Sequence, residues 1–123
     1  MTSETSPPID PQAWGELLAL GGEDAGVMIE ELVTMYLEDG EALLQAIRQH
    51  QAAGDAKALG RSAHALRSPS ATLGALRLAE LCQQVELACG HQPEGTAAQI
   101  PIEAVVKEGQ RVISALQQRL DHP

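Results

Sequence analysis

The stretch IEELVTMYLEDGEALLQAI, residues 29–47, sets the fold class of this chain. Its main apolar residues fall at offsets 0, 3, 4, 7, 8, 14, 15 and 18 from Ile29. This spacing lines them up on one face of a helix over about five turns. Gly40 stands at offset 11, where an apolar residue would belong, so we expect a bend or a close helix contact there. The pattern predicts one long helix from Glu23 to Gly54, after which Asp55 caps the next helix.

A short helix is predicted before this segment. Asp10 and Pro11 match an N-cap residue followed by proline at the first helical position. Gly21 and Gly22 are a stop signal for the same helix. Its apolar face consists of Trp14, Leu17 and Leu18.

Three further helices are predicted after the long one. The third spans 56 to about 74 and the fourth about 75 to 90, and the turn residues of 91–95 lead to a last helix with Pro101 in its first turn. Their inward stripes are Leu59, Ala63, Leu66, Ser70 and Leu73, then Leu78, Leu81, Cys82 and Val85, then Ile102, Val105, Val106, Gly109, Val112, Ile113, Leu116 and Leu120. No stretch alternates as a strand does. The predicted fold is all-α, an antiparallel four-helix bundle with a short additional N-terminal helix.

Length and composition indicate a single small domain. The chain has 123 residues, of which 44% are hydrophobic although only 2% are aromatic, and aliphatic side chains can build a helical core. We expect residues 1–8 to be a disordered tail and 9–121 to form the bundle.

The N-terminus lacks the basic and apolar regions of a secretory signal, and no stretch is long and apolar enough to span a membrane. Cys82 and Cys89 are expected to be buried thiols in a reducing cytoplasm.

The charge of the chain is divided unevenly along its length. The net charge is −9, which argues against a nucleic-acid partner, since such proteins need a basic surface. Residues 1–55 hold 11 acidic side chains and one basic, whereas residues 56–123 hold six acidic and seven basic. Within 56–79 there are four basic residues and no acidic one. An acidic protein therefore carries one positive segment, for which chance and a solvated helix face are the simpler explanation.

His64 is the candidate for chemistry in this positive segment. At about 100° per residue, it points away from the apolar stripe of the third helix, into solvent. Its neighbours on the helix surface, Gly60, Ser68 and Ala71, are all small. A helix surface usually carries longer side chains, so this clearing would give a macromolecular partner access to the imidazole. Arg67, three residues on, could bring a guanidinium near a phosphate or carboxylate on the imidazole.

An exposed imidazole suits phosphoryl transfer. It is largely neutral at physiological pH and nucleophilic through one ring nitrogen. Phosphoryl transfer depends mainly on alignment and charge neutralisation, so one histidine and one adjacent cation suffice if the partner supplies the rest. These residues also fit an ordinary surface histidine, and spacing alone does not decide between the two.

The segment AHALRSPSATLGALRLAELCQQVE, residues 63–86, resembles the signature of histidine-containing phosphotransfer (HPt) domains of bacterial two-component phosphorelays. The similarity extends over most of 12–90. The matching residues are His64, Leu66, Arg67, Ser70, Leu73, Gly74, Ala75, Leu78, Leu81, Cys82 and Glu86.

This resemblance implies a four-helix bundle in which His64 receives a phosphoryl group from the phospho-aspartate of a receiver domain and passes it to another receiver. Arg67 would steady the phosphoryl oxygens, and Glu86 would lie beside the histidine or be an ordinary solvated glutamate. The chain should bind no cofactor, because Mg²⁺ belongs to the receiver's aspartate pocket. With no nucleotide-binding glycine motif, it should not be a kinase. We expect a monomer.

The segment departs from the family pattern at two positions. Ser68 replaces a glycine and Pro69 replaces a serine of the signature. Serine is still small, but Pro69 lacks the N–H that would bond the Ala65 carbonyl and disfavours helical geometry at Ser68. We therefore expect a kink or an early helix end just after His64.

Two other functions remain open from the sequence. The chain could be an interaction module that binds or sequesters a receiver or kinase without carrying phosphate. It could also be an enzyme or metal protein, with zinc held by Cys82, Cys89 and His91, but closely paired ligands are missing. His50, His91 and His122 are expected to be plain polar surface.

Overall fold

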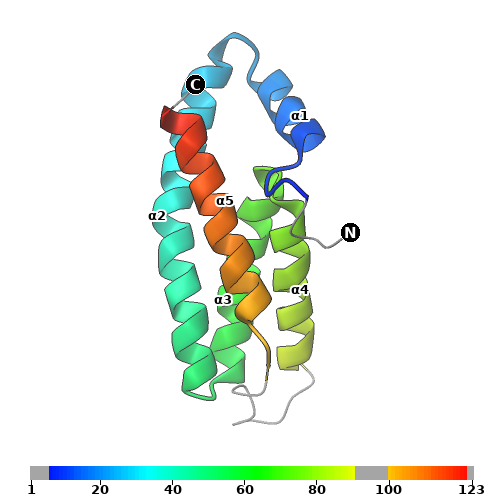
Figure 1. Cartoon of the computed structure of the whole chain (residues 1–123), viewed down its shortest axis with the longest axis vertical. Coiled ribbons are helices and arrows are strands. Elements are labelled where there is room, and N and C mark those ends of the chain that lie inside the picture. The colour runs from blue at the N-terminus through cyan, green and yellow to red at the C-terminus, as the bar shows by residue number, and fades with distance from the viewer. Residues whose placement is uncertain (1–5, 91–99, 122–123) are drawn as a thin grey trace.

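The computed structural model describes residues 6–90 and 100–121. The described elements are α1 (Pro11–Gly21), the short 3-10 helix η2 (Gly22–Asp24), α2 (Ala25–Ala52), α3 (Ala56–Thr72), α4 (Leu76–Gly90) and α5 (Glu103–Asp121). Helices α2 to α5 form an antiparallel bundle in which α3 packs on α2 and α4, and α5 packs on the same two helices (Figure 1). Helix α1 packs against α2. The described residues contain no strand, so the predicted all-α bundle is confirmed.

The helix ends follow the signals in the sequence. The Asp10 carboxylate accepts a hydrogen bond from the Ala13 N–H at 2.9 Å and caps α1, as predicted. The Asp55 carboxylate caps α3 in the same way, through the Ala58 N–H at 3.0 Å. The start of α5 differs: Pro101 precedes its first residue by two positions and does not lie in its first turn.

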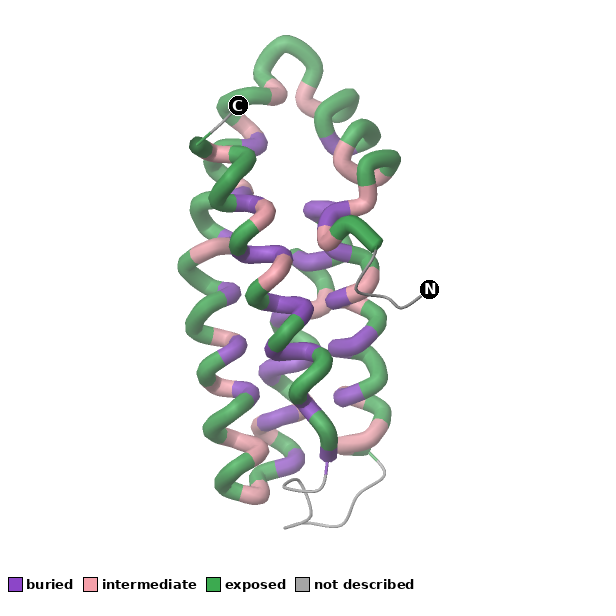
Figure 2. Tube along the Cα trace, viewed as in Figure 1, coloured by how far each residue is buried: buried purple, intermediate pink, exposed green. Residues whose placement is uncertain are grey.

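The predicted inward stripes form the core (Figure 2). All the stripe residues predicted for α3 and α4 are buried, and on α5 only Leu120 is half-buried. The segment before α1 belongs to this core, because Ile9 is buried and the Asp10 N–H donates to the Gly74 carbonyl at 2.8 Å. The Ser6 carbonyl also accepts a hydrogen bond from Arg111 at 2.7 Å. The rest of the expected tail, 1–5, and the expected loop 91–95 lie outside the described residues.

The close helix contact expected at Gly40 lies elsewhere. Helix α2 continues through Gly40, and the atoms nearest to a Cβ there would belong to the Tyr36 ring of the same helix, at an ordinary 3.5 Å. The expectation of a close contact at Gly40 is therefore wrong, and the alternative of a bend there stays a prediction. The tight approach is at Gly109 of α5, where a Cβ would lie 2.7 Å from the Leu44 Cδ2 of α2.

Helix α3 does not end early at Pro69. It continues to Thr72 with the proline inside it, so the expected end just after His64 is wrong, and a kink within the continuous helix stays a prediction. Two buried hydrogen bonds support the helix at this point. The Ser70 hydroxyl donates to the Leu66 carbonyl at 2.6 Å, and the Tyr36 hydroxyl of α2 lies 2.7 Å from the Ser70 oxygen. Because the Ser70 proton is engaged, Tyr36 is the donor in the second bond.

Candidate functional site

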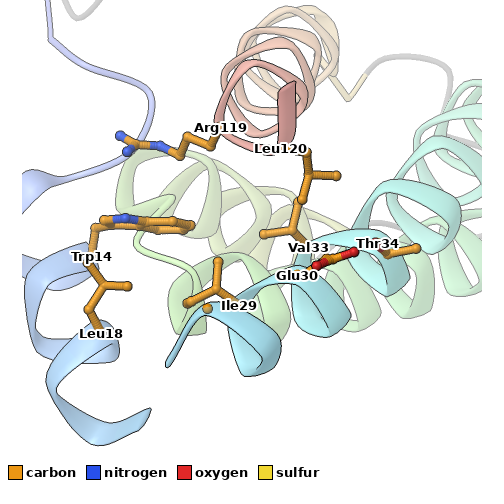
Figure 3. A pocket seen from close by; sticks show the side chains of 9 residues that line it. Trp14, Leu18, Ile29, Glu30, Val33, Thr34, Arg119 and Leu120 are labelled. Carbon is orange, nitrogen blue, oxygen red and sulfur yellow. The ribbon is translucent and has the colours of Figure 1, made fainter. Parts of the chain in front are cut away.

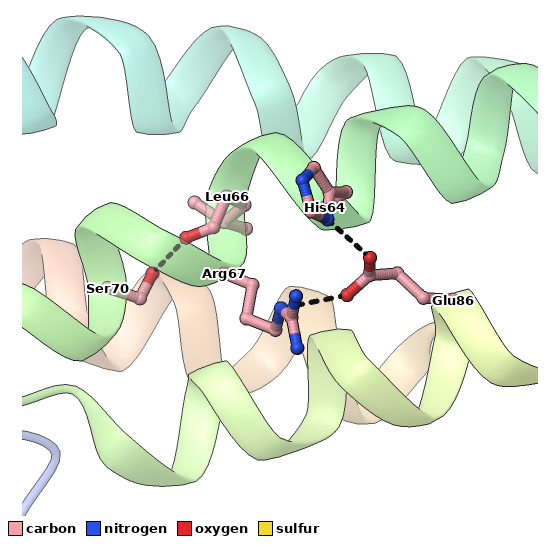
Figure 4. Close-up of polar contacts among 5 residues, drawn as sticks. All are labelled: His64, Leu66, Arg67, Ser70 and Glu86. Carbon is pink, nitrogen blue, oxygen red and sulfur yellow. Dashed lines mark hydrogen bonds and ion pairs between the residues drawn. The ribbon is translucent and has the colours of Figure 1, made fainter.

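His64 lies on α3 with its side chain 66% exposed, as the sequence predicts. The imidazole Nδ1 is 2.7 Å from Glu86 Oε1, which α4 supplies from the neighbouring helix (Figure 4). An ionised carboxylate can only accept a hydrogen bond, so in the neutral form of the ring Nδ1 is the nitrogen that carries the proton. Nε2 is then the nitrogen with the free lone pair, and hence the nucleophile.

Arg67 is paired with the same carboxylate. Its Nε is 3.0 Å from Glu86 Oε2, while Oε1 contacts His64 (Figure 4). The Glu86 side chain is only 20% exposed, so this bridge is partly shielded from water. Glu86 therefore fixes the imidazole and the guanidinium in one arrangement, and it is not the freely solvated glutamate that the sequence left open.

The small residues around His64 do not share one environment. Ser68 and Ala71 are exposed and line a shallow groove with Arg67 on the surface of α3 and α4. Gly60 lines a different depression, which it shares with His64 and Glu86, and it is half-buried. Only Ser68 and Ala71 have the open exposure that the sequence suggested for all three.

Positive side chains flank the histidine on both sides along α3. Lys57 and Arg61 line the depression that contains His64, and Arg67 lines the groove beyond it. Arg77 lies 3.8 Å from Glu80, a solvent-exposed pair of small energetic value. The charge near His64 is therefore mainly positive, and the acidic side chains that line these two surfaces are Glu86 in the depression and Glu80 in the groove.

Both cysteines are free thiols. Cys82 is fully buried, and burial, with a smaller effect of the Glu86 carboxylate, raises the pKa of its thiol to about 12. Burial also raises the pKa of Cys89, which is half-buried. Among the described residues no group of three side chains is arranged to hold a metal, and His91 of the candidate zinc set lies outside them.

A second depression lies between α1, α2 and α5 (Figure 3). Trp14, Ile29 and Leu120 are among its apolar lining residues, and the Arg119 guanidinium lies 4.6 Å from the centre of the Trp14 ring. Neither His64 nor Glu86 is part of its lining. Its lining includes Glu30 and Thr34 but neither a histidine nor a cysteine, so the candidate chemistry stays at His64.

Within 6–90 and 100–121, no helix is sufficiently long and apolar to cross a lipid bilayer.

Comparisons with known proteins agree with this architecture. The family model described as "Hpt domain" matches residues 31–122. Histidine-containing phosphotransfer protein B from Pseudomonas aeruginosa superposes with a TM-score of 0.77 at 24% identity, covering 97% of this chain and 99% of that one. The HPT domain of a sensor hybrid histidine kinase from Shewanella gives 0.76 at 21% identity, covering 94% and 96%. No curated protein matches the chain. At these identities the two structures show a shared fold.

Proposed function

Because this chain belongs to the Hpt domain family, whose members carry phosphoryl groups in phosphorelays, we propose that His64 is its phosphoacceptor. In this proposal His64 takes the group from the phospho-aspartate of one receiver domain and passes it to another receiver. The observation that carries the proposal is the arrangement of one exposed imidazole, held at Nδ1 by a carboxylate that also pairs with Arg67.

The transfer step follows from that arrangement. The Nε2 lone pair of His64 attacks the phosphorus, the N–P bond forms, and the P–O bond to the aspartate breaks, releasing a carboxylate. The proton stays on Nδ1, so the ring becomes cationic as the bond forms. The Glu86 carboxylate, 2.7 Å away, stabilises this developing charge. The reverse attack by a second receiver's aspartate returns the ring to its neutral form.

Arg67 would neutralise the phosphoryl oxygens. Its Nε forms an ion pair with Glu86 Oε2 at 3.0 Å, and the terminal N–H groups of the guanidinium would donate to a phosphoryl group on His64. Mg²⁺ would be held by the aspartate pocket of the receiver. This division fits a loose transition state, which needs positioning and charge neutralisation more than covalent help.

The partners in this proposal are receiver domains with an acidic face. Lys57, Arg61 and Arg67 surround His64 on the exposed side of α3 and would steer such a face toward it. The association rate should therefore fall as salt rises.

We propose a monomeric carrier without kinase activity of its own that acts in the cytoplasm.

The test is direct phosphoryl transfer. The protein is incubated with a phosphorylated receiver domain and Mg²⁺, and we expect a label that is labile in acid and stable in base. His64→Gln should abolish the label, and His50→Gln, which changes a half-buried histidine on α2, should keep it. A label that persists in His64→Gln would disprove the assignment of the residue. Binding to several receivers without any label would instead support the interaction module that carries no phosphate.

A further inference from the structure

Gly60 of α3 packs against Cys89 of α4 beside the site. A Cβ at Gly60 would be 3.2 Å from the Cys89 Cβ and 3.7 Å from its Sγ. We propose that Gly60 is a positioning residue: its missing side chain lets α4 come near enough for Glu86 to hold His64. This inference rests on the proposed function, because it concerns the geometry of the same histidine.

The two contacts are neighbours along the same pair of helices. Gly60 precedes His64 by four residues on α3, and Cys89 follows Glu86 by three on α4. Since the helices are antiparallel, the contact between Gly60 and Cys89 lies about one helical turn, roughly 5 Å, along the helix pair from the contact between His64 and Glu86. All four residues line one depression. A change in helix separation at the first contact is therefore transmitted to the second.

The contact has little room to adjust. A distance of 3.2 Å between two Cβ atoms is tighter than ordinary van der Waals contact, which begins near 3.4 Å. A Cβ is fixed to the backbone and cannot rotate away, so a methyl group at Gly60 can be accommodated only if α3 and α4 separate by a few tenths of an ångström. The hydrogen bond between Nδ1 and Oε1, now 2.7 Å, would lengthen by a similar amount and weaken.

Backbone conformation does not explain a glycine at this position. Gly60 lies inside α3, and within 6–90 and 100–121 the glycines with positive φ are Gly22, Gly54 and Gly74. In a helix interior alanine is more favourable than glycine, so the sequence gives up helix stability here. Close packing against Cys89 supplies the reason.

The test compares Gly60→Ala with Gly26→Ala. Gly26 lies in α2, and a Cβ there would meet nothing within 4 Å, so this variant controls for the gain in helix propensity. Two quantities are measured: the nitrogen-15 NMR shifts of the His64 ring, which report its tautomer, and the rate of transfer from a phosphorylated receiver. Gly60→Ala should increase the fraction of the other tautomer and slow transfer by about fivefold, because a charged hydrogen bond is weakened. Gly26→Ala should change neither.

A double variant separates packing from other effects. Gly60→Ala combined with Cys89→Gly removes the Cβ that the new methyl group would meet. The double variant should restore both the ring signature, meaning the nitrogen-15 shifts of the His64 ring, and the transfer rate. An unchanged ring signature in Gly60→Ala, or a defect that the double variant does not rescue, would overturn the inference. The NMR measurement needs no phosphoryl group. If the unaltered protein is never labelled, the proposed function fails while the positioning role is still decided.

Discussion

Replacing Glu86 tests the central contact of the site. Glu86→Ala removes both the acceptor for His64 Nδ1 and the partner of Arg67 Nε. Glu86→Gln keeps an oxygen that can accept from Nδ1 and loses only the charge. The imidazole in the alanine variant is free to rotate and to place its proton on either nitrogen. Transfer should therefore slow in both variants, and more in Glu86→Ala.

The expected decrease in transfer rate follows from the solvent exposure of His64 and Glu86. A hydrogen bond to a charged group contributes about 1.5–3 kcal/mol, and an exposed ion pair at most about 1 kcal/mol. His64 is 66% exposed, so solvent screens part of the interaction, and about 1–2 kcal/mol remains for transition-state stabilisation. The transfer rate should then fall by about 5- to 30-fold in Glu86→Ala. In Glu86→Gln, which retains the acceptor, a loss of about 2- to 5-fold is expected.

Single-turnover transfer from a phosphorylated receiver measures this rate, and urea unfolding of each variant shows whether the fold is intact. Stability should change by less than about 1 kcal/mol, because Glu86 lies at the edge of the core and Arg67 can reach water once unpaired. A second readout is the thiol of Cys82, whose pKa Glu86 helps to raise and which should fall in Glu86→Gln. Glu86→Ala transferring at the unaltered rate would refute the role given to this carboxylate.

Two further predictions concern stability. Gly109→Ala should destabilise the bundle by about 1 kcal/mol, because its methyl group would lie 2.7 Å from Leu44 Cδ2 and overpacking outweighs the gain in helix propensity. Gly15→Ala, with open space around it, should instead be neutral or stabilising in urea unfolding. Equal effects of the two variants would contradict the tight contact of Gly109 with Leu44. Burial raises the pKa of Cys82 from 9.0 and that of Tyr36 from 10.0 to about 12 in the folded protein. The unfolded chain therefore loses these protons at a lower pH than the folded protein does. The free energy of unfolding should fall from about pH 9 upward, by about 1.4 kcal/mol per pH unit for each titrating group. Cys82→Ala should make the fall in stability above about pH 9 shallower in urea titrations, because only the half-buried Cys89 and then Tyr36 still titrate. An unchanged slope would show that the buried Cys82 thiol does not contribute.

Local patterns in the sequence were sufficient to predict the helices and the exposure of His64. The Asp10 and Asp55 caps lie where their side chains reach the backbone N–H groups of the next turn, an interaction that spans only three residues. The orientation of His64 follows from the angle per residue relative to the apolar stripe. Such features depend on short segments, and the sequence predicts them without knowledge of what packs on them.

Pro69 shows where local rules fail. Proline inside a helix predicts an early end, and α3 nevertheless continues to Thr72. Tyr36, more than thirty residues earlier in the chain, hydrogen-bonds Ser70 from the adjacent helix and supports this part of α3. A rule that considers only the neighbours of Pro69 has no access to this interaction.

The sequence by itself determined an all-α bundle, one exposed histidine in a positive segment, and a family signature that implied a glutamate nearby. Only the tertiary structure decided that one Glu86 carboxylate joins His64 to Arg67, and that Gly60 faces Cys89 instead of open solvent. The physical reason is the register between α3 and α4. Hydrophobic periodicity fixes which face of each helix is buried, but the axial and lateral offset of two helices depends on side-chain contacts between them, and those contacts set the geometry of the site.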